Sequence, residues 1–124
     1  MKVSDRYLRG LLMDVVSQRA NGFCEFPYCN EIDCSPHHWF TKKNAAIKYD
    51  PDACIYLCNF HHTAGPDSAH RQPIKFQYSI LANGIRTNEW LMNIIEKKNM
   101  TVKDNDLFRE YWKGKLLEEF RRAA

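Results

Sequence analysis

Apolar residues recur at helical spacing near the start of the chain. Leucines and valines over residues 4–20 repeat every three or four positions, which places them on one face of an α-helix. Ser4 is a typical residue for capping a helix N-terminus, and Asn21 and Gly22 are typical of a helix stop. We therefore predict an N-terminal helical segment over residues 4–21.

The middle of the chain has two short stretches that are typical of β-strands. Residues 37–40 and residues 53–57 are rich in aromatic and β-branched side chains. Prolines break the cysteine-bearing stretch 23–36 before them, so no long element is expected there. We predict two short strands, followed by a short helix that begins near Asn59 and is broken at Gly65.

Helical spacing returns in the last part of the chain. Pro73 suits the first position of a helix over residues 73–81, and Thr87 can cap another helix. Either Thr101 or Asp104 can cap a final one. The side chains expected on the inner faces of these last two helices are apolar: Trp90, Leu91, Ile94, Ile95, Leu107, Phe108, Tyr111, Trp112, Leu116 and Phe120. The element order predicts an α+β fold: a helix, a compact β-β-α unit, then helices.

Composition and charge narrow the class of protein only slightly. A length of 124 residues favours a single domain over residues 1–124. An apolar fraction of 44% is ordinary for a globular chain, and a net charge of +3 permits a polyanionic partner without requiring one. The sequence contains neither an 18-residue apolar stretch nor a signal-peptide pattern, so we expect a cytoplasmic protein that does not span a membrane.

The cysteines and histidines are more informative than the composition, because all ten lie between Cys24 and His70. Clustered cysteines in a cytosolic chain indicate metal binding before they indicate disulfides, and an odd count of five cysteines agrees. The middle third is also poor in long apolar runs, so a structural metal would help it to fold. The ten residues form two interleaved sets, one rich in cysteine and one made of histidines.

The cysteine-rich set suits a structural zinc ion, which needs four ligands. Cys24 and Cys29 form one pair, and Cys58 and His61, two residues apart, form the other. The identity of the fourth ligand stays open, because a nearby cysteine, Cys34 or Cys54, could replace His61, and Cys54 could equally be a core residue of its strand. Buried free cysteines without a metal are the alternative interpretation.

The second set contains His37, His38, His62 and His70. Adjacent side chains of a strand point to opposite faces, so His37 and His38 cannot both bind one ion in the same way. One of them can bind metal while its neighbour lies beside the ion. An imidazole with a pKa near neutrality, next to a metal-bound phosphate, is a suitable base for deprotonating water. This set therefore predicts hydrolytic chemistry rather than a purely structural role.

Together these motifs resemble a known family. Ser35-Pro36-His37-His38, the run from Ile55 to His62 with Gly65 after it, and the later His70 are similar to the HNH endonucleases, whose active site is a ββα-metal motif. The resemblance is strongest to small phage and prophage nucleases of the recombination-enhancement type. It covers residues 23–85 and implies a zinc-stapled ββα-metal core there, flanked by C-terminal helices over residues 86–124.

The resemblance also implies a role for each residue of the motif. His38 would be the general base, while His37, His62 and His70 would bind a catalytic Mg²⁺, Mn²⁺, Ni²⁺ or Zn²⁺ ion. The structural Zn²⁺ would be bound by four residues: Cys24, Cys29, Cys58 and His61. One departure is Ala53, which occupies the position of the family's central asparagine. That asparagine usually fixes the loop that carries the base.

By the same resemblance, the substrate would be DNA, hydrolysed to a 5′-phosphate and a 3′-hydroxyl in a bacterial or phage-infected cell. Lys42, Lys43, Arg71 and Arg86 are candidate phosphate contacts. A recombination or replication protein is a further candidate partner. Two alternatives remain: a non-catalytic zinc module that binds nucleic acid or protein, which would not need the histidine set, and an inactive nuclease-derived subunit, which Ala53 favours.

Overall fold

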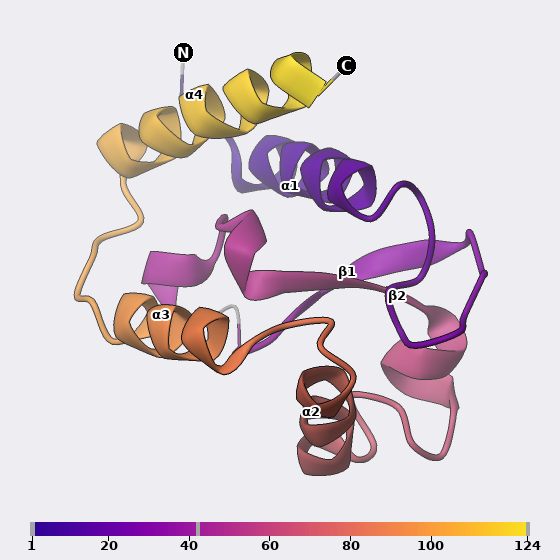
Figure 1. Cartoon of the computed structure of the whole chain (residues 1–124). Coiled ribbons are helices and arrows are strands. Elements are labelled where there is room, and N and C mark those ends of the chain that lie inside the picture. The colour runs from indigo at the N-terminus through magenta and orange to yellow at the C-terminus, as the bar shows by residue number, and fades with distance from the viewer. Residues whose placement is uncertain (1, 42, 124) are drawn as a thin grey trace.

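Two short antiparallel strands and helices on either side of them make up an α+β fold (Figure 1). The structure, a computed structural model, describes residues 2–41 and 43–123. In chain order the elements are α1 (Asp5–Arg19), β1 (Cys34–His38), the 3-10 turns η1 (Ala45–Ile47) and η2 (Pro51–Ala53), β2 (Cys54–Cys58), the π-helical turn η3 (Phe60–Ala64), α2 (Pro73–Ala82), α3 (Asn88–Lys98) and α4 (Asp106–Ala123).

Polar side chains set the starts of three helices. The Tyr7 amide donates to Ser4 Oγ at the start of α1, and the Trp90 amide donates to Thr87 Oγ1 at the start of α3, which confirms both predicted caps. The prediction for α4 was wrong, because the Phe108 amide donates to Asn105 Oδ1 at 2.9 Å. Neither Thr101 nor Asp104 is the cap.

The strands are offset from the predicted ones. β1 and β2 pair in the register Cys34↔Cys58 to His38↔Cys54, so β1 starts and ends earlier than expected. Pro36 lies inside β1, although we expected proline to break this stretch. An edge strand tolerates proline because one of its sides needs no donor, and a two-stranded sheet consists of edges only.

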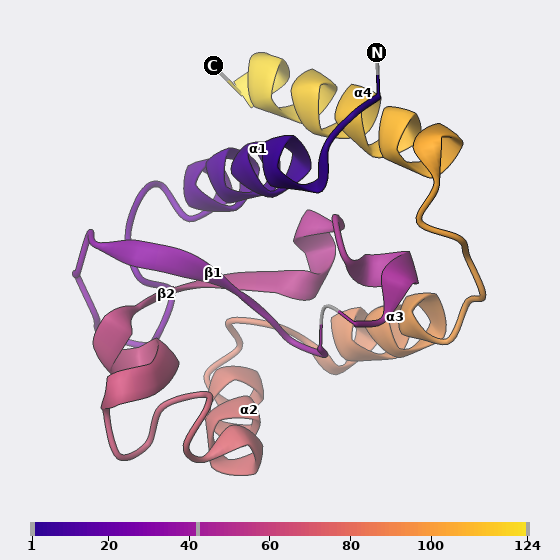
Figure 2. The ribbon, with the colours of Figure 1, turned by 180° about the vertical axis from the view of Figure 1, so that it is seen from behind.

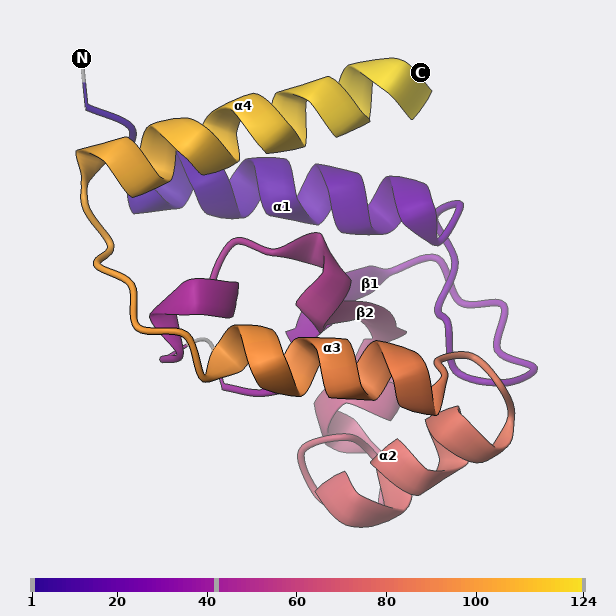
Figure 3. The same ribbon diagram turned by 60° about the vertical axis from the view of Figure 1, so that its left-hand side comes forward.

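The helices lie in layers around this sheet. α1 packs against the strands and α4 covers α1 from outside, whereas α2 and α3 lie on the opposite side of the sheet (Figure 2). α1 and α4 run in the same direction (Figure 3). Arg109 near the start of α4 donates to the Val3 carbonyl, and Arg19 at the end of α1 pairs with Glu119 at 2.6 Å.

The middle of the chain holds more of the core than its sequence suggested. All five residues of β2 are buried, and Ile47 and Tyr49 in the connection before it are fully buried. In α4, Leu116 is buried and Phe108 and Trp112 are partly buried against the core, as predicted. Leu107, Tyr111 and Phe120 are exposed, Leu107 to 81%, so their predicted inward orientation was wrong.

None of the helices in the described part of the chain combines the length and apolar character that a bilayer span requires.

Candidate metal centres

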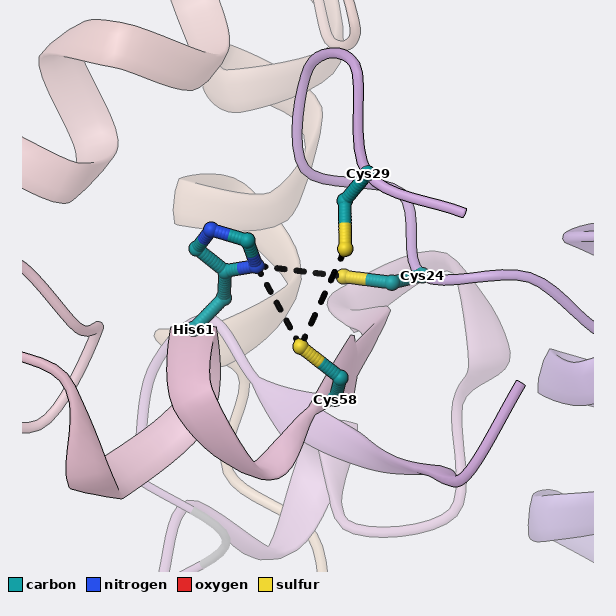
Figure 4. A group of neighbouring side chains, drawn as sticks. All are labelled: Cys24, Cys29, Cys58 and His61. Carbon is teal, nitrogen blue, oxygen red and sulfur yellow. Dashed lines mark hydrogen bonds between the residues drawn. The ribbon is translucent and has the colours of Figure 1, made fainter. Parts of the chain in front are cut away.

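Cys24, Cys29, Cys58 and His61 converge where the loop after α1 meets the end of β2 (Figure 4). Their four ligand atoms lie within 4.8 Å of one another. The Nδ1 atom of His61 is 3.3 Å from Cys58 Sγ and 3.7 Å from Cys24 Sγ, and the sulfurs of Cys29 and Cys58 are 3.9 Å apart.

These separations fit a tetrahedral zinc site. Zinc–sulfur bonds of about 2.3 Å and zinc–nitrogen bonds of about 2.0 Å imply ligand separations of about 3.8 Å between sulfurs and about 3.5 Å between sulfur and nitrogen. The donor set, three thiols and an imidazole, is also a common one for structural zinc. The predicted group is therefore assembled in a geometry that could hold a zinc ion.

Backbone contacts bring the cysteine loop to β2. The Glu25 amide donates to the Tyr56 carbonyl at 2.8 Å, and the Tyr56 amide donates back to the Glu25 carboxylate at 2.7 Å. Phe26 in this loop stacks on the His61 ring, with 4.1 Å between ring centroids and 9° between the planes. Both sides of the cysteine-rich group are thus held by contacts outside the ligands themselves.

The two alternative ligands have other partners. Cys34 Sγ lies 3.3 Å from the Glu31 carbonyl, and Cys54 Sγ lies 3.7 Å from the Asp50 carbonyl at the far end of β2. Neither belongs to the four-residue group. Burial raises the pKa of the Cys24 thiol to about 12, so a nearby cation would be needed to hold it as a thiolate.

A second group consists of His37 from β1, His62 from η3 and His70 from the loop between η3 and α2. Their ring nitrogens lie within 4.8 Å of one another, and the ring centroids are 4.7–5.2 Å apart. The three rings meet edge to face or tilted rather than stacked. Three imidazoles leave coordination positions for water or substrate, which is typical of a catalytic rather than a structural metal site.

Several contacts hold this histidine group in place. The Ala69 and His70 amides donate to the carbonyls of His61 and His62 at 2.9 and 3.1 Å, so the loop that carries His70 is anchored to η3. Ser35 Oγ lies 3.2 Å from His62 Nδ1.

Burial, followed by the charges of His62 and His70, lowers the pKa of His37 to about 3. The neutral imidazole that results is the form that binds metal.

His38 lies beside this group but is held differently. Its Nε2 atom is 3.0 Å from the Lys48 carbonyl, an acceptor, so Nε2 carries a hydrogen; in the neutral ring the lone pair is then on Nδ1. His37 and His38 separate as expected for neighbours on a strand, His37 toward His62 and His70. Both still line one cavity of about 450 Å³, together with His62 and His70.

The predicted phosphate contacts divide into three cases. Lys43 and Arg71 are exposed. The Arg86 guanidinium pairs with Glu25 at 3.0 Å and donates to the Cys54 carbonyl at 3.2 Å, so it has structural contacts, and its contact with phosphate stays a prediction. Lys42 lies outside the described residues.

The position of the family's asparagine holds no polar side chain. Ala53 is fully buried, and its carbonyl accepts a hydrogen bond from the Trp39 amide at 2.8 Å. The Lys48 carbonyl, which contacts His38, was missed by the sequence analysis. A backbone acceptor leaves no signal in the residue type, whereas Ser35 could have been found from its place two residues before His37.

No protein-family model, curated protein or solved structure matches this chain.

Proposed function

We propose that this chain is a metal-dependent endonuclease of the HNH type that hydrolyses phosphodiester bonds in DNA. One observation carries the proposal: three histidines grouped as metal ligands share a cavity with a fourth histidine, beside a separate and complete cysteine-rich group. A structural zinc site alone would need only the cysteine-rich group. The extra histidines therefore favour a catalyst over a non-catalytic zinc module.

The residues of the cavity suit this chemistry. A divalent ion bound by His37, His62 and His70 would neutralise the charge on a phosphoryl oxygen and on the leaving oxygen. His38 would take a proton from water at Nδ1, because its Nε2 donates to the Lys48 carbonyl. In the family the asparagine fixes the loop that carries the base, and here the contact with the Lys48 carbonyl would orient His38 instead. Ala53 is therefore compatible with an active enzyme.

The donor set also narrows the metal. Imidazole ligands favour Zn²⁺ and Ni²⁺, whereas Mg²⁺ prefers carboxylate, carbonyl and water oxygens. Mn²⁺, which lies between them in preference, is a further candidate. We therefore expect cleavage with Ni²⁺, Zn²⁺ or Mn²⁺ at concentrations where Mg²⁺ supports little.

A plasmid-nicking assay across these metals tests the proposal. His38→Ala removes a proton acceptor and should lower the rate by about 10²–10⁴-fold, with no recovery at higher metal concentration. His37→Ala and His62→Ala should weaken metal binding instead, so excess metal should restore part of their activity. The matched control is Thr63→Ala, which changes an exposed hydroxyl next to His62.

We expect every variant to keep its structural zinc, because none of the substitutions changes the cysteine-rich group. Zinc content and thermal stability should be recorded for each variant to check this. Rescue of His38→Ala by metal, without rescue of His37→Ala, would reverse the two roles. Equal cleavage by all variants and the parent would show that the nuclease activity belongs to a contaminant, and the proposal would fail.

A further inference from the structure

Ser35 faces the histidine group from β1. It lies two residues before His37, and residues two apart on a strand share a face. Register pairing with Leu57 places Ser35 next to the end of β2, from which η3 and His62 continue. The 3.2 Å contact between Ser35 Oγ and His62 Nδ1 thus joins two elements that each supply a histidine to the group.

This contact bears on which nitrogen of His62 can reach a metal ion. A neutral imidazole has one N–H and one lone pair, and only the lone pair binds metal. With Nδ1 directed at the hydroxyl, Nε2 is the nitrogen left for an ion. Histidines that bind metal usually donate their other ring N–H to a nearby acceptor, which fixes both tautomer and ring orientation. Donation from Nδ1 to Ser35 Oγ would do this for His62.

His38 has the opposite arrangement in the same cavity. Its Nε2 contacts the Lys48 carbonyl, which leaves the lone pair on Nδ1. Ser35 would place the lone pair of His62 on Nε2. The two imidazoles would then be held in different tautomers, each suited to its proposed task.

We infer that Ser35 is a positioning residue that holds His62 as an Nε2 ligand of the histidine metal site. This inference rests on the metal site of the proposed function. Outer contacts of this kind typically change metal affinity by about 10–100-fold. Ser35 would therefore set the affinity of the site without touching the ion.

Calorimetric titration with Ni²⁺, on the chain of residues 1–124 carrying one zinc, tests the inference. Ser35→Ala should bind Ni²⁺ about 10–100-fold more weakly than the parent. Ser35→Thr keeps the hydroxyl and should retain most of the affinity. Thr63→Ala is the matched control, because it removes a hydroxyl that contacts Asn59 one turn away, and it should bind like the parent.

A second readout needs neither Ni²⁺ nor activity. Long-range ¹H–¹⁵N spectra of the zinc-loaded parent should show the His62 hydrogen on Nδ1, and Ser35→Ala should lose this preference. An Nε2–H tautomer in the parent would overturn the inference even if Ser35→Ala failed to fold.

The outcomes separate this inference from the proposed function. If Ser35→Ala binds Ni²⁺ as tightly as the parent, the inference fails, whether or not the protein cuts DNA. If Ser35→Ala binds weakly while the parent cuts no DNA, the positioning role stands and the nuclease proposal falls. A parent whose histidine group binds none of Ni²⁺, Zn²⁺ and Mn²⁺ overturns both.

Discussion

At the scale of single residues, His61 and His62 are neighbours that belong to different centres. His61 completes the cysteine-rich group, and His62 joins the histidine group. A π-helical turn carries both, and such turns are frequent at functional sites. Because consecutive side chains on a turn diverge, one short element can supply two sites. Any shift of η3 should therefore disturb both centres together.

Gly65, directly after η3, is the residue at which the dependence of both centres on the position of η3 can be tested. A Cβ atom there would lie 2.6 Å from the Phe60 carbonyl oxygen and 3.1 Å from the Phe60 ring. We predict that Gly65→Ala destabilises the protein by about 1–3 kcal/mol, the usual cost of overpacking. Urea unfolding measures this, and weaker Ni²⁺ binding should accompany it because η3 carries His62 and the loop after η3 carries His70.

Gly10 in the middle of α1 provides the matched control. A Cβ at this position meets no heavy atom within 4 Å. Gly10→Ala should stabilise the protein by about 0.4–1 kcal/mol, chiefly by restricting the unfolded chain. If Gly65→Ala proved as stable as Gly10→Ala, the close approach at Phe60 would not constrain η3.

At the scale of elements, the sequence predicted helices better than strands. Ser4 and Thr87 cap their helices as expected, because capping is a local interaction between residues three apart. β1 was misplaced because its limits depend on pairing with β2, some twenty residues later, and not on its own composition. Spacing suggested the cysteine-rich group but left its fourth member open, and the group of His37, His62 and His70 came from the family resemblance. The contacts of Ser35 and Lys48 depend on how the elements pack.

The prediction of Asp104 as a possible cap of α4 was wrong for a related reason, because its carboxylate binds other side chains, one of them far away in the sequence. Its carboxylate accepts from Arg109 at 2.7 Å and from Lys48, 56 positions away, at 3.0 Å. The hydrogen bond from Arg109, followed by that from Lys48, lowers the pKa of Asp104 to about 2. Asp104 thus links α4 to the connection between the strands.

This carboxylate should make stability depend on pH in the acid range. A folded pKa below the unfolded value means that the contribution is complete above about pH 4 and is lost as pH falls toward 2. We predict that Asp104→Asn lowers the urea midpoint at pH 7 and that its difference from the parent shrinks between pH 4 and 2. Asp106→Asn, on the exposed first turn of α4, controls for loss of charge alone. A difference that stays constant with pH would contradict this role of Asp104.

At the scale of the whole molecule, zinc should contribute to folding itself. The cysteine-rich group joins the loop after α1 to the end of β2, so its binding energy would be folding energy. We predict one tightly held zinc per chain and, after strong chelation, unfolding of at least residues 23–62, measured by hydrogen exchange. A metal-free protein that stays fully folded would contradict this.

Cys34 and Cys58 form a matched pair for the same test, because they face each other in one register position and both are buried. Cys58 belongs to the cysteine-rich group, whereas Cys34 does not. Cys58→Ser should lose zinc, and Cys34→Ser should keep it. Equal zinc loss by both variants would place Cys34 among the ligands.

Binding to DNA should depend on salt if exposed basic residues contact the phosphates. Each phosphate contact releases condensed counterions, so neutralising Lys43 or Arg71 should reduce the log–log salt slope by about 1. Arg86→Gln should leave the slope unchanged, because Arg86 pairs with Glu25. Affinity that does not change with salt would favour a protein partner and the non-catalytic zinc module.

The parallel pairing of α1 and α4 has a consequence for protein synthesis. All cysteines and histidines of both groups lie before residue 71. The contacts between α1 and α4 join residues that are 100 positions apart for Arg19 and Glu119, and 106 apart for Arg109 and Val3. On the ribosome, both ligand groups are therefore complete while α1 still exposes the face that α4 later covers. Metal would be able to bind at these proposed sites in the nascent chain first, and α4 would dock onto α1 only after residues 106–123 have emerged.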